Sequence, residues 1–187
     1  ALEGASVTVG GIAVTTDAAG HAVFTGKTMG TYAYTVTKSA YNDVAGNATV
    51  GTSDKTESVS MSLTPYTLTF NVTTGGNALE GASVTVGGIA VTTDAAGHAI
   101  FTGKTMGTYA YTVTKSGYND VTGNAVVGTG DISENVSMVL TSYSVTFTVT
   151  NGTSAIVGAS VTINSTSVTT DASGHAVFSN MLPGTYS

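Results

Sequence analysis

The sequence predicts an all-β fold, built from tandem seven-stranded Greek-key β-sandwich domains in a linear array. Three observations predict it. The segment TTDAAGHA recurs at a fixed spacing, apolar residues alternate with Thr and Asn in short segments, and turn-forming residues separate those segments. No stretch shows the apolar periodicity of a helix.

The repeat has a period of 77 residues. Asp17, Asp94 and Asp171 occupy the same place in TTDAAGHA, TTDAAGHA and TTDASGHA, and no insertion or deletion interrupts the register. Between residues 1–39 and 78–116 the one difference is Val23 against Ile100. Such regular self-similarity indicates a tandem array, which provides length, stiffness or several equivalent binding sites. The repeat therefore favours a structural or adhesive role.

The copy between residues 66 and 141 is complete, and its pattern predicts seven short strands. Tyr66 to Val72 alternates apolar and polar residues, as expected of a half-buried strand. The Gly87-Gly88 pair suits a two-residue hairpin turn. The other expected strands lie at 84–86, 89–91, 98–101, 108–115, 125–127 and 136–140.

The recurring TTDAAGHA segment is interpreted as a tight turn between two strands. The Asp94 carboxylate can accept hydrogen bonds from backbone N–H groups a few residues further on. Gly97 can adopt the positive φ that closes such a turn, because it has no Cβ. Asp17 and Asp171 are assigned the same role in the other copies.

The repeat frame divides the chain into three domains. Residues 1–64 form a partial repeat that lacks its first strand, 65–141 form a complete repeat, and 142–187 form a partial repeat that lacks its last strands. The junctions, at 64–65 and 141–142, are too short for flexible linkers, so neighbouring domains are expected to touch. The partial ends favour a piece of a longer array; completion by strands donated from other chains is the alternative.

Composition narrows the function classes. The chain has 11 acidic and 5 basic residues and a net charge of −6, which disfavours nucleic acid as a partner. It has no Cys, which excludes disulfides and thiolate zinc sites. No apolar run is long enough for a membrane span, and the sequence does not open with the charged start and apolar core of a signal peptide, so any export signal is expected outside these residues. The Thr-, Ser-, Asn- and Gly-rich composition favours an extracellular or cell-surface location.

The order ALEGASVTVGG, TTDAAGHAIF and MGTYAYTVTKSGYNDV resembles the carboxypeptidase regulatory-like domains. These belong to a transthyretin-like, Ig-like sandwich group that includes the collagen-adhesin B-type repeats of prokaryotic surface proteins. Some adhesin relatives carry an isopeptide bond formed by a Lys of the first strand. The first strand here, YTLTFNVT, contains no Lys, and Lys104 and Lys115 lie elsewhere, so no isopeptide is expected. The residues that carry the resemblance are Gly81, Ala82, Val84, Asp94, Gly97, Phe101, Gly107, Tyr109, Gly117 and Tyr118.

No catalytic, cofactor-binding or metal-binding residues are predicted, no cofactor is expected, and the chain is not expected to be an enzyme. His21, His98 and His175 occur once per copy, whereas a metal site needs several converging ligands. Asp131 and Glu134 alone are a poor calcium loop. No GxSxG motif accompanies the many Ser and Thr residues.

The recurring tyrosines have two interpretations. Tyr109 and Tyr111 fall on one side of a strand, which favours core positions over a sugar-stacking platform. The same choice applies to the equivalent tyrosines of the other copies. N-glycosylation sequons begin at Asn47, Asn71, Asn135, Asn151 and Asn164.

Taken together, the sequence predicts a structural repeat segment of an extracellular surface or filament protein, acting as a rigid stalk, fibre or scaffold. Its expected partners are neighbouring domains and other copies in a filament or surface layer. The alternatives are a multivalent adhesin or glycan-binding array, and accessory domains of a secreted hydrolase.

Overall fold

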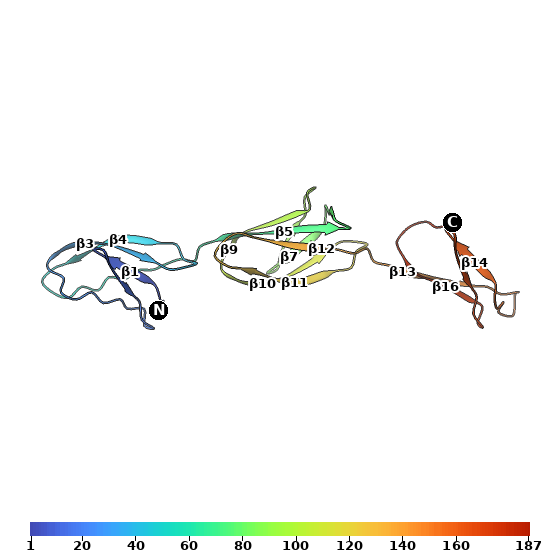
Figure 1. Cartoon of the computed structure of the whole chain (residues 1–187), viewed down its shortest axis with the longest axis horizontal. Helices are drawn as coiled ribbons and strands as arrows, with labels where there is room; N and C mark the ends of the chain where they lie inside the picture. Colours follow the sequence, from blue (N-terminus) through green and yellow to red (C-terminus); the bar gives the residue numbers. More distant parts are fainter. The chain divides into compact units, whose positions relative to one another are not determined.

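The computed structural model describes all residues from 1 to 187, and it confirms an all-β chain of antiparallel sheets. Strands pair only with strands of the same repeat, so each repeat forms its own sheets (Figure 1). The repeats are therefore described one at a time. The chain contains no helix that could cross a membrane.

The middle repeat forms two sheets. One has the strand order β11-β10-β7-β8; in the other, β5 lies between β12 and the short β6 and also pairs with β9. Phe70 of β5 and Tyr111 of β10 meet edge to face, with ring centroids 4.8 Å apart, so the sheets face each other here. The strands are β5 (Tyr66–Thr74), β6 (Asn77–Ala78), β7 (Ser83–Val86), β8 (Ile89–Thr92), β9 (His98–Lys104), β10 (Gly107–Thr114), β11 (Val121–Val127) and β12 (Ile132–Ser137).

The alternating pattern of the sequence explains which side chains are buried in the middle repeat. On β5 every second side chain, from Leu68 through Phe70 to Val72, is fully buried, while the intervening Thr and Asn residues face outward. The inward side chains of β7, β10 and β11 are buried in the same way: Val84, Val86, Tyr111, Val113, Ala125 and Val127. Removal of this apolar surface from water is the main stabilising term of the repeat.

Three strand boundaries differ from the prediction. Strand β9 continues to Lys104, and β11 begins at Val121, inside the segment predicted to be a turn. The last strand, β12, ends at Ser137, before most of the predicted range 136–140. Its continuation still bonds to the sheet, because the Met138 N–H donates to the Thr73 carbonyl over 2.8 Å. The ends of these strands therefore depend on the strand that each one pairs with, and not only on its own alternation of apolar and polar residues.

The first repeat forms a single four-stranded sheet of order β2-β1-β3-β4. Strands at 21–24 and near 59–63 were also predicted, and the structure has neither. Their counterparts in the middle repeat, β9 and β12, both pair with β5, and residues 1–64 hold no equivalent of β5. Without that strand they lack a ladder partner. The strands are β1 (Ser6–Val9), β2 (Ile12–Thr15), β3 (Gly30–Thr37) and β4 (Val44–Val50).

The third repeat forms two small sheets, β13-β16 and β14-β15. A buried cluster of Ile163, Ala176 and Phe178 joins β14 to β16, with Val161, Val168 and Met181 around it. The Phe147 ring of β13 meets Phe178 edge to face at 5.9 Å. The strands are β13 (Tyr143–Thr148), β14 (Ser160–Ile163), β15 (Thr166–Thr169) and β16 (His175–Met181).

Candidate functional site

The TTDAAGHA turn folds in the same way in all three repeats and confirms the predicted turn. In the middle repeat, the Asp94 Oδ1 atom accepts hydrogen bonds from the N–H groups of Ala96 at 2.9 Å and His98 at 2.8 Å. Gly97 has a φ of 79°, and a Cβ there would collide with the carbonyl oxygen of Val72. The residue must be glycine because β5 passes directly beside the turn.

The hydrogen bonds of this turn change the acidity of its carboxylate. The His98 N–H lowers the pKa of Asp94 below its ordinary value of 3.8, and the Ala96 N–H adds to the effect against a desolvation that raises it. The pKa values of Asp17 and Asp171 are lowered by the same kind of bond, first of all from the N–H groups of His21 and His175. Each carboxylate therefore serves as a turn acceptor.

A buried threonine joins the same turn to the preceding loop, and the sequence did not single it out. The Thr93 hydroxyl accepts a hydrogen bond from the Ala82 N–H at 2.8 Å and donates one to the Leu79 carbonyl at 2.6 Å. The equivalent Thr16 and Thr170 make the same pair of bonds. The sequence feature that could have pointed to them is that a threonine occupies this place in all three copies of the motif. These bonds hold the loop against the sheet.

The three histidines are placed separately, one in each repeat. His98 is exposed, and its Nδ1 atom lies 4.0 Å from the Asp94 carboxylate of the same turn. His21 and His175 are exposed as well. Nowhere in the chain do three or more His, Cys, Asp or Glu side chains gather as a metal-binding group would.

One tyrosine of each repeat closes the loop that precedes its own position. The hydroxyl groups of Tyr32, Tyr109 and Tyr186 donate to the carbonyl oxygens four residues earlier. In the middle repeat the Lys104 ammonium lies 5.1 Å from the centre of the Tyr109 ring, and Lys27 lies 5.3 Å from that of Tyr32. The hydroxyl group of each of these tyrosines is therefore bonded within its own loop, and the rings of Tyr32 and Tyr109 also contact a nearby lysine.

The second tyrosine of the strand lies over a glycine of the neighbouring strand. A Cβ at Gly123 would lie 2.5 Å from the Tyr111 Oη atom, and one at Gly46 would lie 2.5 Å from the Tyr34 Oη atom. The ring thus fills the space that a side chain would otherwise take. Tyr111 is 9% exposed, which supports the core interpretation of this tyrosine.

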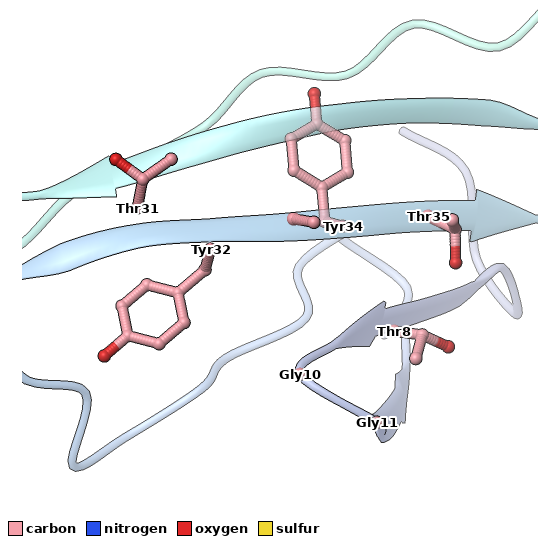
Figure 2. A pocket seen from close by; sticks show the side chains of 8 residues that line it. Thr8, Gly10, Gly11, Thr31, Tyr32, Tyr34 and Thr35 are labelled. Atoms are coloured by element: carbon pink, nitrogen blue, oxygen red, sulfur yellow. The ribbon is translucent and has the colours of Figure 1, made fainter.

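A shallow recess of about 450 Å³ lies on the first repeat (Figure 2). It forms where β1 ends: Val9 pairs with Tyr34, so the part of β3 before Tyr34 has no partner on that edge. Figure 2 shows the rings of Tyr32 and Tyr34 leaning away from each other, which gives no shared flat platform for a sugar. The lining side chains carry no charge; they belong to Thr8, Gly10, Gly11, Thr31, Tyr32, Ala33, Tyr34 and Thr35.

The remaining candidate side chains are engaged in structural contacts. The Asp131 carboxylate accepts a hydrogen bond of 2.7 Å from the Thr67 N–H, which ties the start of β5 to the residue before β12. The Lys115 ammonium donates to the Glu80 carbonyl at 2.7 Å. Two sequon side chains meet, because the Asn71 amide donates to the Asn135 Oδ1 atom at 2.9 Å.

No protein-family model matches this chain, and no curated protein matches it. Among solved structures, it is similar to the Bacillus anthracis TIE protein, with 22% identity and a TM-score of 0.61. That match covers 99% of this chain, which spans 41% of the length of that structure. The likeness supports the fold.

Two pilin structures also match. The minor pilin of Streptococcus agalactiae is 14% identical, with a TM-score of 0.34, over 70% of this chain and 68% of its own. A streptococcal ancillary pilin is 16% identical, with a TM-score of 0.38, over 86% of this chain and 65% of its own.

Proposed function

We propose that this chain is a structural segment of an extracellular surface or filament protein, in which tandem domains act as a stiff stalk or scaffold. In this proposal each complete repeat is a Greek-key sandwich of the transthyretin-like kind, with seven main strands besides the two-residue β6, and the segment has no catalytic activity. The observation that carries the proposal is the copying of structural contacts from repeat to repeat, while no group of reactive side chains is assembled.

The copied contacts are those that hold backbone in place. All three repeats contain the same turn carboxylate, the same buried threonine and the same tyrosine hydroxyl bond. Repetition of a reactive site would place chemistry at each copy, whereas repetition of these contacts gives each copy the same backbone-holding turn and loop. Stable units in series suit a load-bearing or spacing role.

Short junctions support stiffness. The Thr64 N–H donates to the Ala40 carbonyl at 2.9 Å, and β5 begins at Tyr66, so Pro65 alone lies between the two repeats. The Thr141 N–H likewise donates to the Gly117 carbonyl at 2.9 Å, and β13 begins at Tyr143. One residue cannot act as a flexible tether, and Pro65 has a fixed φ.

Imaging of the native protein tests this function. Gold-labelled antibodies against the middle repeat should decorate extended structures outside the producing cell. A two-repeat segment should give no signal on glycan arrays. Labelling confined to the cell interior would contradict the scaffold function, and specific, saturable glycan binding would support the adhesin alternative instead.

A further inference from the structure

Strand β8 of the complete middle repeat has a free edge. It is the last strand in the order β11-β10-β7-β8, and the strands of the neighbouring repeats pair within their own sheets. Its sequence, IAVT, contains no charged residue, no Pro and no Gly, and its pairing with β7 runs without a bulge over all four residues. Proteins usually protect a sheet edge with a Lys, a Pro or a bulge, because an unprotected edge can pair with another chain.

The alternation of an antiparallel ladder determines which backbone groups face this edge. The Thr93 N–H donates to the Ala82 carbonyl at 2.8 Å, so the backbone of Thr93 bonds on the side of β7. Successive residues of a strand direct their backbone groups to opposite sides, so those of Ala90 and Thr92 point away from β7. Both residues are exposed. Each of them therefore offers one N–H and one carbonyl group to a further strand.

The apolar side chains of β8 are also incompletely covered. Val91 lies opposite Val84 and Ile89 lies opposite Val86, so they share the face on which these two β7 valines are fully buried. Ile89 nevertheless remains 60% exposed, and Val91 is half-buried. The equivalent Ile12 of β2 is 57% exposed, so the exposure belongs to the edge position itself. A strand added beside β8 would remove this apolar surface from water.

We propose that β8 of one copy pairs antiparallel with β8 of a second copy and joins the two sheets into one. A two-fold axis beside Val91 satisfies the edge groups of both strands, because Ala90 pairs with Thr92 of the second copy and Thr92 pairs with its Ala90. Val91 then faces Val91 of the second copy at a position where side chains approach closely. The same surface is used on both copies, so the contact closes as a two-fold dimer.

The repetition of this edge favours a second copy of the chain as the partner. Strands β2 and β15 also end their sheets, and the N–H groups of Thr16 and Thr170 bond inward as that of Thr93 does. An edge of four residues buries little surface, so one pair of edges binds weakly. A second copy carries the same edges at the same 77-residue spacing in sequence, and repeated contacts raise the avidity of a weak one.

Disulfide crosslinking tests both the pairing and its register, because the chain has no Cys. In Val91→Cys the two new thiols would face each other within disulfide distance. In Ala90→Cys they would lie on the diagonal, roughly 7–8 Å apart, which is too far for a bridge. In a glutathione buffer, Val91→Cys chains should form covalent dimers about tenfold faster than Ala90→Cys chains, although position 90 is the more exposed. Equal rates, or faster dimerisation of Ala90→Cys, would overturn the proposal.

Sedimentation equilibrium of the 187-residue chain measures the association without a crosslink. The native chain should dimerise reversibly as its concentration rises. Ile12→Lys combined with Ile89→Lys should weaken the dimer about tenfold, because an inward-pointing charge on an edge strand opposes pairing. The matched pair Val23→Lys with Ile100→Lys, at exposed positions away from these edges, should associate as the native chain does. A native chain that stays monomeric, or an unchanged dimer in the edge variant, would refute the pairing; if circular dichroism shows that a lysine variant has lost its fold, the crosslinking result decides.

This inference rests on the proposed scaffold function for its setting and deepens it by naming a contact between copies. The two can fail separately, because the imaging and glycan experiments concern location and ligands, whereas crosslinking and sedimentation measure association of purified chains. Monomeric chains that still belong to extended structures outside the cell would refute the β8 pairing and leave the scaffold function in place.

Discussion

At the scale of single residues, a few threonine hydroxyl groups are buried and stabilise the fold by bonding to backbone groups, although most threonines of this chain lie on the surface. Thr93 is 3% exposed and satisfies one backbone donor and one backbone acceptor. Thr92, its neighbour, is exposed on β8. The two adjacent threonines therefore provide a matched pair for separating a structural hydroxyl from a solubilising one.

Replacement of Thr93 by Val should destabilise the middle repeat by about 1–3 kcal/mol, because the Ala82 N–H and Leu79 carbonyl lose their partner inside the protein. Hydrogen exchange of the Val84 amide would measure the loss. Thr92→Val should change stability by no more than about 0.5 kcal/mol. Equal effects of the two substitutions would show that the buried hydrogen bonds are not what matters.

The turn carboxylates predict an acid-sensitive element. The pKa of Asp94 is lower in the folded chain than its ordinary value of 3.8, so its stabilising contribution is present above that value. The contribution is lost as the pH falls through the folded pKa. Amide exchange at Ala96 and His98 should therefore accelerate below about pH 4.

Asp94→Asn provides the control for this acid sensitivity, because its side-chain oxygen can still accept a hydrogen bond but carries no titrating charge. The variant should show the same exchange rates at Ala96 and His98 above and below the transition, after correction for intrinsic rates. Retention of the acid transition in Asp94→Asn would assign it to another group.

The turn acceptor could be predicted from sequence, whereas the buried threonine could not. The role of Asp94 follows from local geometry, since its partners lie two and four residues further on. Thr93 bonds to Leu79 and Ala82, at separations of 14 and 11 residues. Such partners depend on the path of a whole loop, which alternation and turn propensity do not specify.

At the scale of strands, the chain contains a natural comparison between nearly identical segments. Residues 98–104 form β9, while residues 21–27 form no strand, although the two segments differ only by Ile100 against Val23. The difference lies in the presence of β5 beside one of them. Local alternation therefore predicts where a strand can form, but the strand forms only where its partner strand is also present.

The pairing of tyrosine with glycine across two strands can be tested by adding one methyl group. Gly123→Ala should destabilise the middle repeat by about 1–3 kcal/mol, because the new Cβ would overlap the Tyr111 ring. Gly128→Ala is the matched change, since a Cβ there meets open space. Chemical denaturation followed by circular dichroism would compare them. A Gly123→Ala chain as stable as native would mean that the ring moves freely.

At the scale of the whole molecule, the period of 77 residues could be read from the sequence, together with the all-β class. The prediction was wrong for the first repeat, because it assumed that the strands at 21–24 and near 59–63 would form there as their counterparts do in the middle repeat. A copy without its first strand keeps one sheet and loses the second. The second sheet therefore depends on β5, which pairs with both β9 and β12 in the middle repeat.

Junction length determines stiffness in the proposed scaffold. Insertion of about six Gly and Ser residues between Thr64 and Tyr66 should turn a stiff junction into a flexible one. Small-angle scattering of the inserted and native chains would then differ, with a broader range of dimensions for the inserted chain. Indistinguishable scattering would mean that the native junction is already flexible.

The most direct test of the central claim, that the repeats form a stiff series, is a distance measurement between spin labels. The chain has no Cys, so Ala18→Cys with Ala95→Cys, and Ala95→Cys with Ala172→Cys, place labels at equivalent exposed turns. Electron–electron double resonance should give one narrow distance distribution for each pair. A broad distribution for either pair, like that of the Gly-Ser insertion, would contradict the account.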